Sequence, residues 1–278
     1  MRLSISNIAW SIDEDPSIAK LLQSYNIDAI DIAPGKYFAD PCNTSDIEIA
    51  NVKNWWLDRG IEITGMQALL FGTTGLNMFG TPDSKSAMLK HLDAVCRIGA
   101  GLGANRLVFG SPKNRDRAGL SDKETLDIAR VFFNNLGDIA ISHGVVVCLE
   151  PNPPIYNSNF MTTSLETADM VTLTNHPAIK MQLDTGAITL NKEDAIVIVK
   201  NWDHLIGHIH ISEPNLVPLG DGTTNHDLMR FALDALPSRT VLTIEMLATA
   251  NEPHMRSIKR SLNLAITKYR NSLTDLKR

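Results

Sequence analysis

The segment Gly144-Val145-Val146-Val147-Cys148-Leu149-Glu150 is a short apolar run that ends in a carboxylate. The same pattern, an apolar run closed by an acidic or imidazole side chain, recurs downstream at Asp184, His210 and Glu245. The four closing residues are separated by 34, 26 and 35 positions, each close to the ~30 residues of one strand-helix-strand repeat. Parallel strands with this spacing carry all four side chains to the same edge of one sheet.

The alternation of short β-branched runs with longer amphipathic stretches continues along the whole chain. Eight strands are predicted, at residues 2–9, 27–33, 61–68, 104–110, 144–150, 178–184, 206–212 and 240–246. Helices are predicted between them, near residues 15–25, 44–59, 83–102, 121–142, 163–175, 191–200, 225–236 and 252–270. Eight βα units without a linker predict a single (β/α)8 TIM barrel, one α/β domain over residues 1–278. An open doubly wound sheet is the alternative, but residues 8–11 lack its Gly-rich first turn.

Helix start and stop signals agree with this alternation. Asp83 and Ser121 are predicted N-caps, and Ser121 with Glu124 fits a capping box. Left-handed helix stops are predicted at Gly60, Gly103 and Gly144.

Composition excludes several classes of partner. The chain has 278 residues, a net charge of −5 and 44% hydrophobic residues, which argues against a nucleic-acid partner that needs a basic face. The N-terminus has no signal-peptide pattern, and no run approaches the ~18 apolar residues of a membrane span. Three widely spaced cysteines do not predict a disulfide framework. We therefore expect a cytoplasmic protein without a membrane partner; a homo-oligomer is compatible with these features.

The four strand-end residues predict a metal site. Functional residues of a (β/α)8 barrel lie at the carboxyl ends of its strands, and Glu150, Asp184, His210 and Glu245 end four consecutive predicted strands. A single such residue could equally be a helix cap, but four in succession favour ligation. Three carboxylates and one imidazole predict one divalent ion, with Mn²⁺ favoured and Mg²⁺, Co²⁺ or Zn²⁺ as alternatives.

The sequence resembles the xylose-isomerase-like TIM barrels, which include sugar-phosphate isomerases and epimerases, ketose 3-epimerases, inosose dehydratase and endonuclease IV. The resemblance rests on residues 149–153 (LEPNP), 183–186 (LDTG), 208–213 (HIHISE) and 244–246 (IEM). It implies that the metal holds the substrate's carbonyl and neighbouring hydroxyl oxygens and stabilises an enediolate. It also implies that Glu150 and Glu245 remove and return a proton from opposite faces of the substrate.

The sequence departs from two members of this group. Where ketose 3-epimerases anchor substrate hydroxyls with a histidine, an arginine and a glutamate, this chain has Ala187, Leu216 and Tyr156. A free-ketohexose epimerase is therefore disfavoured. The extra histidines of endonuclease IV are absent from residues 65–68 and 107–110 and from position 187, which disfavours DNA repair.

Further residues are predicted to contact the substrate. Trp10, Gln67, Asn152 and Tyr156 follow or end predicted strands, and the alternative for Trp10 is a core cap. His208 lies one layer below His210, where it could contact the substrate, support His210 or fill the core. Glu213 is predicted to bind substrate or orient His210.

A cationic loop, residues 113–117 (KNRDR), follows the fourth predicted strand. Lys113, Arg115 and Arg117 could hold a phosphate or carboxylate there, and solvated surface charge is the alternative. Gly220-Asp221-Gly222 is a weaker phosphate-binding candidate.

Three functions remain open from the sequence. The first is a metal-dependent sugar or sugar-phosphate isomerase or epimerase that acts through an enediolate on a small-molecule substrate. The second is a metal-dependent dehydratase of a cyclic polyol or keto-sugar, a lyase that begins with the same proton abstraction. The third is a sugar-binding barrel without turnover.

Overall fold

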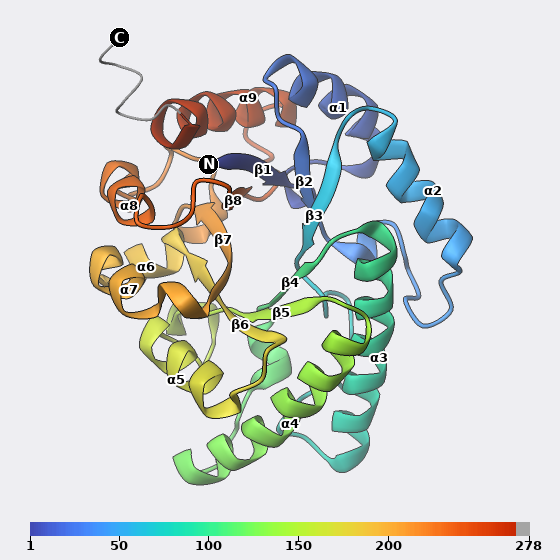
Figure 1. Ribbon diagram of the computed structural model, residues 1–278, viewed down its shortest axis with the longest axis vertical. Coiled ribbons are helices and arrows are strands. Elements are labelled where there is room, and N and C mark those ends of the chain that lie inside the picture. The colour runs from blue at the N-terminus through green and yellow to red at the C-terminus, as the bar shows by residue number, and fades with distance from the viewer. Residues whose placement is uncertain (271–278) are drawn as a thin grey trace.

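The eight predicted strands form one closed parallel barrel in the computed structural model, which describes residues 1–270 (Figure 1). The strands are β1 (Arg2–Ser6), β2 (Ala29–Ile32), β3 (Glu62–Met66), β4 (Arg106–Phe109), β5 (Val146–Leu149), β6 (Ile179–Asp184), β7 (Ile206–Ser212) and β8 (Val241–Glu245). They pair in chain order, and β1 pairs with β8 to close the ring. The predicted (β/α)8 barrel is therefore confirmed, and the doubly wound alternative is wrong.

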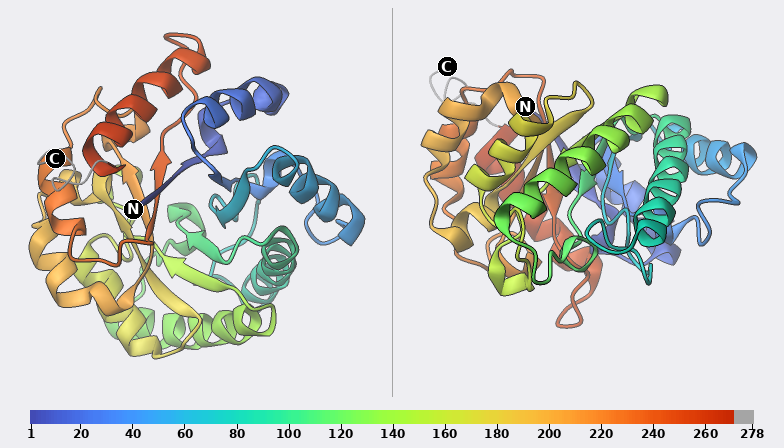
Figure 2. Two further views of the ribbon diagram at one scale, coloured as in Figure 1. Left: turned by 45° about the horizontal axis from the view of Figure 1, so that its top comes forward. Right: turned by 90° about the horizontal axis from the view of Figure 1, so that it is seen from below.

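Helices enclose the strands on all sides of the barrel (Figure 2). They are α1 (Asp15–Ser24), α2 (Asp46–Leu57), α3 (Pro82–Leu102), α4 (Asp122–Ser142), α5 (Ser164–Thr174), α6 (Thr185–Asn191), α7 (Ala195–Trp202), α8 (His226–Leu233) and α9 (His254–Ala265). The short helix α6 was not predicted. It starts directly after β6 because the Asp184 side chain accepts a hydrogen bond from the Ala187 N–H and caps its first turn.

The helix boundaries mostly follow the predicted signals. Ser121 and Glu124 form the expected capping box of α4, and Gly60, Gly103 and Gly144 have φ of 71°, 88° and 72°. The prediction for Asp83 is wrong. Thr81 caps α3 instead, because Pro82 occupies the first helical position and Thr81 accepts from the Ser84 N–H at 3.2 Å.

The interior of the barrel contains a buried polar cluster below the carboxyl ends of the strands. Asp31 of β2 accepts hydrogen bonds from Thr64 and Thr243, each at 3.0 Å, and its Oδ2 lies 2.7 Å from His208 Nε2. Burial alone would raise the pKa of Asp31, but the charge and hydrogen bond of His208 lower it. This cluster ties β2, β3, β7 and β8 together through side chains.

Single-turn 3-10 helices shape the carboxyl end of the barrel. They follow five strands, at Asn7–Ala9, Pro34–Lys36, Pro112–Arg115, Pro154–Tyr156 and Pro214–Leu216. A π-helical turn, Ile266–Arg270, follows α9. Among residues 1–270, no helix contains an apolar stretch long enough to cross a bilayer.

Candidate metal centre

The structure brings the four predicted ligands together at the carboxyl end of the barrel. Asp184 and His210 are directly paired across β6 and β7, and Glu245 pairs with Ser212, two positions further along β7 than His210. Glu150 follows β5. One potential ligand atom from each of the four residues lies within 4.8 Å of the others.

Electrostatics within this cluster match a cation site. Burial, together with the charges of Glu245 and Glu150, raises the pKa of Asp184 to about 8. Burial alone would lower the pKa of His210, but Glu245 and Glu150 raise it well above its usual value. His210 Nδ1 lies 3.2 Å from Glu245 Oε2 and 3.6 Å from Glu150 Oε1. Three carboxylates this close and this buried repel one another, and a divalent cation held by oxygen donors and one imidazole would offset that repulsion.

Hydrogen bonds orient each carboxylate. Asp184 Oδ2 accepts from the Ser212 hydroxyl at 2.8 Å, and Glu245 Oε1 accepts from Gln67 Nε2 at 2.6 Å. Burial alone would raise the pKa of Glu245, but His210 and the Gln67 hydrogen bond lower it. Gln67 therefore helps to keep the Glu245 carboxylate ionised.

Glu150 is held by neighbours from two loops. Its Oε2 accepts from Asn152 Nδ2 at 3.2 Å, and it lies so close to Gly110 that a Cβ there would come within 2.4 Å of Oε2. Only glycine at position 110 leaves room for the carboxylate in this position.

Arg115 does not face solvent as the cationic-loop hypothesis required. Its side chain is 0% exposed; Nη1 donates to the Glu150 carbonyl at 2.8 Å and Nη2 to Asn152 Oδ1 at 2.5 Å. Arg117 pairs with Asp122. The phosphate-binding prediction is therefore wrong for Arg115, because the 3-10 turn at Pro112–Arg115 directs it inward beneath Glu150. Phosphate binding by Arg117 stays a prediction.

A cleft with two adjoining lobes opens above the cluster. The smaller lobe has a volume of about 320 Å³ and the larger about 800 Å³. Both are lined by Glu150, Glu245, Leu216 and Leu247. Three residues of the larger lobe, Ala68, Ser111 and Leu216, have φ of 54°, 41° and 52°. Left-handed non-glycine residues are strained and concentrate at functional sites.

Several predicted substrate residues line this cleft. Asn152 and Tyr156 belong to the smaller lobe, and Gln67 and Lys113 to the larger one. The Lys113 ammonium donates to the Thr73 carbonyl at 3.1 Å. Their contact with a substrate stays a prediction.

Two other predicted substrate residues, Trp10 and His208, lie outside this cleft. Trp10 is 1% exposed and outside both lobes, and its indole N–H donates to Asp15 at 2.7 Å, so it is a core cap. His208 is held by Asp31 and lines a cavity at the opposite end of the barrel. Asp31, His208 and His210 form a second group whose potential metal-ligand atoms lie within 4.8 Å of one another. In this group the Asp31 carboxylate already accepts hydrogen bonds from Thr64 and Thr243.

Glu213 lines the smaller lobe, but its carboxylate is used within its own loop. It accepts from the Gly220 and Thr224 N–H groups at 2.9 Å and contacts His226 Nε2 at 3.0 Å. Burial alone would raise the pKa of Glu213, but these bonds lower it. The prediction that Glu213 binds substrate or orients His210 is therefore replaced by a role in fixing the loop after β7.

Sequence reasoning missed Asp31, Lys36 and the close approach at Gly110. Asp31 had a signal, since it is the one acid in the apolar run Ala29–Ile32. Lys36 lines the larger lobe and donates to the Asn7 carbonyl at 2.5 Å, and no motif marks it. Burial lowers its pKa.

Comparison with known proteins agrees with this architecture. An inosose dehydratase from Lacticaseibacillus casei is 23% identical over 228 residues, 77% of this chain and 71% of that protein. The structure of D-psicose 3-epimerase from Clostridium cellulolyticum H10 with D-tagatose superposes with a TM-score of 0.80 at 17% identity, over 96% of this chain and 99% of that one. The 3-keto-D-glucoside 4-epimerase of E. coli superposes with a TM-score of 0.75 at 15% identity, over 95% and 99% of the two chains.

At these identities the superpositions establish the fold alone. The sequence model of the xylose isomerase-like TIM barrels, however, matches residues 19–265, which is most of the chain. This protein therefore belongs to the xylose isomerase-like TIM barrel family.

Proposed function

We propose that this protein is a divalent-metal-dependent carbohydrate isomerase or epimerase that transfers a proton next to a carbonyl, through an enediolate. The observation that carries the proposal is the cluster of Glu150, Asp184, His210 and Glu245, of which the three carboxylates line the smaller lobe of the cleft. Its donor set fits a divalent cation. Two of the superposed structures are sugar epimerases, which supports the proposal.

A metal held by these four residues would supply Lewis-acid stabilisation of the negative charge that develops on the substrate oxygens. The proton transfer itself falls to Glu150 and Glu245. Glu150 directly follows β5 and Glu245 ends β8, and both line the two lobes of the cleft. A substrate between them could lose a proton to one and receive it from the other. His210 and the hydrogen bond from Gln67 lower the pKa of Glu245 against burial, which favours the ionised form that a base requires.

The walls of the cleft favour a substituted sugar over a free ketohexose. Tyr156, Ala187 and Leu216, which stand where ketose 3-epimerases have hydroxyl anchors, all line the smaller lobe. The larger lobe, with Phe71, Leu70 and Leu247 in its walls, offers apolar surface and room for a substituent. Lys113, also in its wall, could contact a negatively charged substituent.

The test is turnover by the purified protein with Mn²⁺ present, on free ketoses, keto-glycosides and sugar phosphates. The proposal expects a product of unchanged mass with either an inverted stereocentre or a carbonyl group moved to the neighbouring carbon. It also expects chelation to abolish activity and added metal to restore it. A sugar that binds but is not converted and incorporates no solvent deuterium would favour a sugar-binding barrel without turnover.

A metal-dependent dehydratase is the second candidate, and the inosose dehydratase relative favours it. The same first proton abstraction would then be followed by loss of a hydroxyl group. Mass spectrometry separates the two candidates, because the dehydratase product is lighter than its substrate by one water.

A further inference from the structure

A second large cavity lies at the end of the barrel opposite the metal centre. Its volume is about 640 Å³, within the range of small-molecule sites. It is lined by the first residues of five strands, namely Arg2, Glu62, Arg106, Ile206 and Val241. It therefore opens at the amino ends of the strands, whereas the candidate metal centre lies at their carboxyl ends.

Cations outnumber acids in this cavity. Arg2, Lys53, Arg106 and Arg239 line it, against Glu62 and Asp203. Arg2 is neutralised by Glu62 at 2.8 Å and Asp28 at 2.9 Å. Within residues 1–270, no carboxylate oxygen lies within 4.0 Å of a side-chain nitrogen of the other three cations. This local excess of positive charge belongs to a chain with a net charge of −5.

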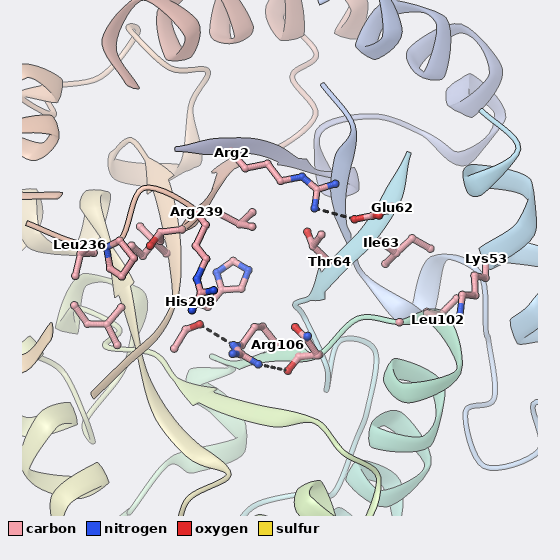
Figure 3. Close-up of a pocket in the computed structure, with 18 of the residues that line it drawn as sticks. Arg2, Lys53, Glu62, Ile63, Thr64, Leu102, Arg106, His208, Leu236 and Arg239 are labelled. Atoms are coloured by element: carbon pink, nitrogen blue, oxygen red, sulfur yellow. Dashed lines mark hydrogen bonds and ion pairs between the residues drawn. The ribbon is translucent and has the colours of Figure 1, made fainter. Parts of the chain in front are cut away.

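The guanidinium groups of Arg106 and Arg239 point into the same central space, beside the imidazole of His208 (Figure 3). Arg106 uses two nitrogens to donate to backbone carbonyls, those of Gly207 and Asn105, each at 3.0 Å. These bonds hold its guanidinium in place without neutralising its charge. An arginine fixed in this way is prepared to bind an oxyanion.

The rest of the wall has a different character. Ile63, Leu102, Ile209 and Leu236 are buried apolar residues that border the cavity. Figure 3 places Ile63 and Leu102 to one side of the arginines and Leu236 to the other. A ligand that fills this space therefore carries an anionic group and also an uncharged body.

We propose that this cavity is a binding site for a small organic phosphate, whose phosphate group lies between Arg106 and Arg239. A phosphate monoester carries nearly two negative charges at neutral pH, which matches two unneutralised guanidinium groups better than one carboxylate does. The inner wall is His208, held by Asp31, and these buried side chains separate the cavity from the cleft at Glu150. The ligand is therefore distinct from a substrate at the metal centre, and the proposal does not depend on the proposed reaction.

The test is isothermal titration calorimetry of the full-length protein at low ionic strength, with glucose 6-phosphate, inorganic phosphate or glucuronate as the ligand. Binding of glucose 6-phosphate is expected, with glucuronate weaker. Arg239→Gln should weaken binding by about tenfold, as expected for loss of a charged hydrogen-bond donor. Arg106→Lys keeps the positive charge but loses the paired N–H donors of the guanidinium, and it should also weaken binding of glucose 6-phosphate. The control is Arg256→Gln, since Arg256 is a 75% exposed arginine on α9 outside the cavity, and it should leave binding unchanged.

Lys113→Ala shows whether the phosphate binds at the other end of the barrel. If Lys113→Ala abolishes binding and Arg239→Gln does not, the ligand occupies the cleft and the proposal is overturned. Equal losses in Arg239→Gln and Arg256→Gln would indicate nonspecific attraction to surface charge, and would overturn it too. Absence of binding, or glucuronate binding as tightly as glucose 6-phosphate, would also contradict it.

Discussion

Arg115 Nη1 donates a hydrogen bond to the backbone carbonyl of Glu150 across 2.8 Å, from a position without solvent exposure. A second bond, to Asn152, reaches the Glu150 carboxylate through the Asn152 amide. Burial lowers the pKa of Arg115 to about 10, so the guanidinium is still charged near neutral pH. Arg115 is therefore placed to position Glu150, through its main chain and its side chain.

Replacing Arg115 by methionine should lower kcat by about tenfold or more for phosphorylated and unphosphorylated substrates alike. The reason is that the variant loses the hydrogen bond from Arg115 to the Glu150 carbonyl and the one to Asn152, which contacts the Glu150 carboxylate. A hydrogen bond to a charged group contributes roughly 1.5–3 kcal/mol. Arg117→Ala is the matched control, because Arg117 forms an exposed pair with Asp122, and its kcat should stay within about twofold. A rise of KM confined to phosphorylated substrates, with kcat unchanged, would contradict this positioning role of Arg115.

Gly110→Ala should displace the Glu150 carboxylate, because the added Cβ would lie 2.4 Å from Oε2. We expect weaker metal binding and at least about tenfold lower activity, with Tm changed by only a few degrees. Gly119→Ala is the control, since a Cβ there meets nothing within 4 Å. Calorimetric metal titration and steady-state kinetics of both variants test this prediction. Full activity in Gly110→Ala would show that catalysis does not require this position of the Glu150 carboxylate.

Metal binding should release protons. Burial and the two neighbouring glutamates raise the pKa of Asp184 to about 8 in the metal-free protein, so this carboxyl is largely protonated at pH 7. A cation binds the ionised form, so its apparent affinity should rise between pH 6 and pH 8. Titrations with Mn²⁺ in two buffers of different ionisation enthalpy measure the protons released. Release should be smaller in Asp184→Asn, and a pH-independent affinity without release would contradict this description of the cluster.

Glu213→Gln should destabilise the fold near neutral pH by about 1–3 kcal/mol, because it weakens bonds to a buried carboxylate. Burial opposes the shift, but the His226, Thr224 and Gly220 contacts lower the folded-state pKa of Glu213. Its stabilising contribution is therefore present above the unfolded-state pKa and is lost as pH falls through the folded-state value. Urea unfolding should show a wild-type advantage in unfolding free energy at pH 7 that narrows as the pH falls below 4.5, the ordinary value for a glutamate. The control is Asp127→Asn, which removes an exposed ion pair with Lys123 and should change the free energy of unfolding little. If the difference between wild type and Glu213→Gln stayed constant with pH, the ionised Glu213 could not be its source.

The fold and the candidate ligands could be predicted because both depend on local pattern. Each of Glu150, Asp184, His210 and Glu245 lies in or directly after an apolar strand, and a closed parallel barrel brings consecutive strand ends together.

The contacts around these ligands could not be predicted, because they depend on how the loops fold. Arg115 and Lys113 are two positions apart in one charged loop, yet one is buried under Glu150 and the other lines the cleft. Trp10 follows β1 as a pocket aromatic would, but the nearby Asp15 binds its indole in the core. Sequence spacing does not specify such loop conformations.

Proton exchange with solvent tests the central claim most directly, namely that Glu150 and Glu245 transfer the substrate proton. The wild-type protein with Mn²⁺ should incorporate deuterium from D₂O into its substrate at the carbon next to the carbonyl. In a two-base epimerase, Glu150→Gln and Glu245→Gln should each abolish net epimerisation. Each variant should still exchange with solvent the proton of the one epimer that faces its remaining base, and this epimer should differ between the two variants. An isomerase with one principal base predicts exchange in only one of them. If both variants retain metal and full turnover, neither glutamate is a base and the proposed mechanism is wrong.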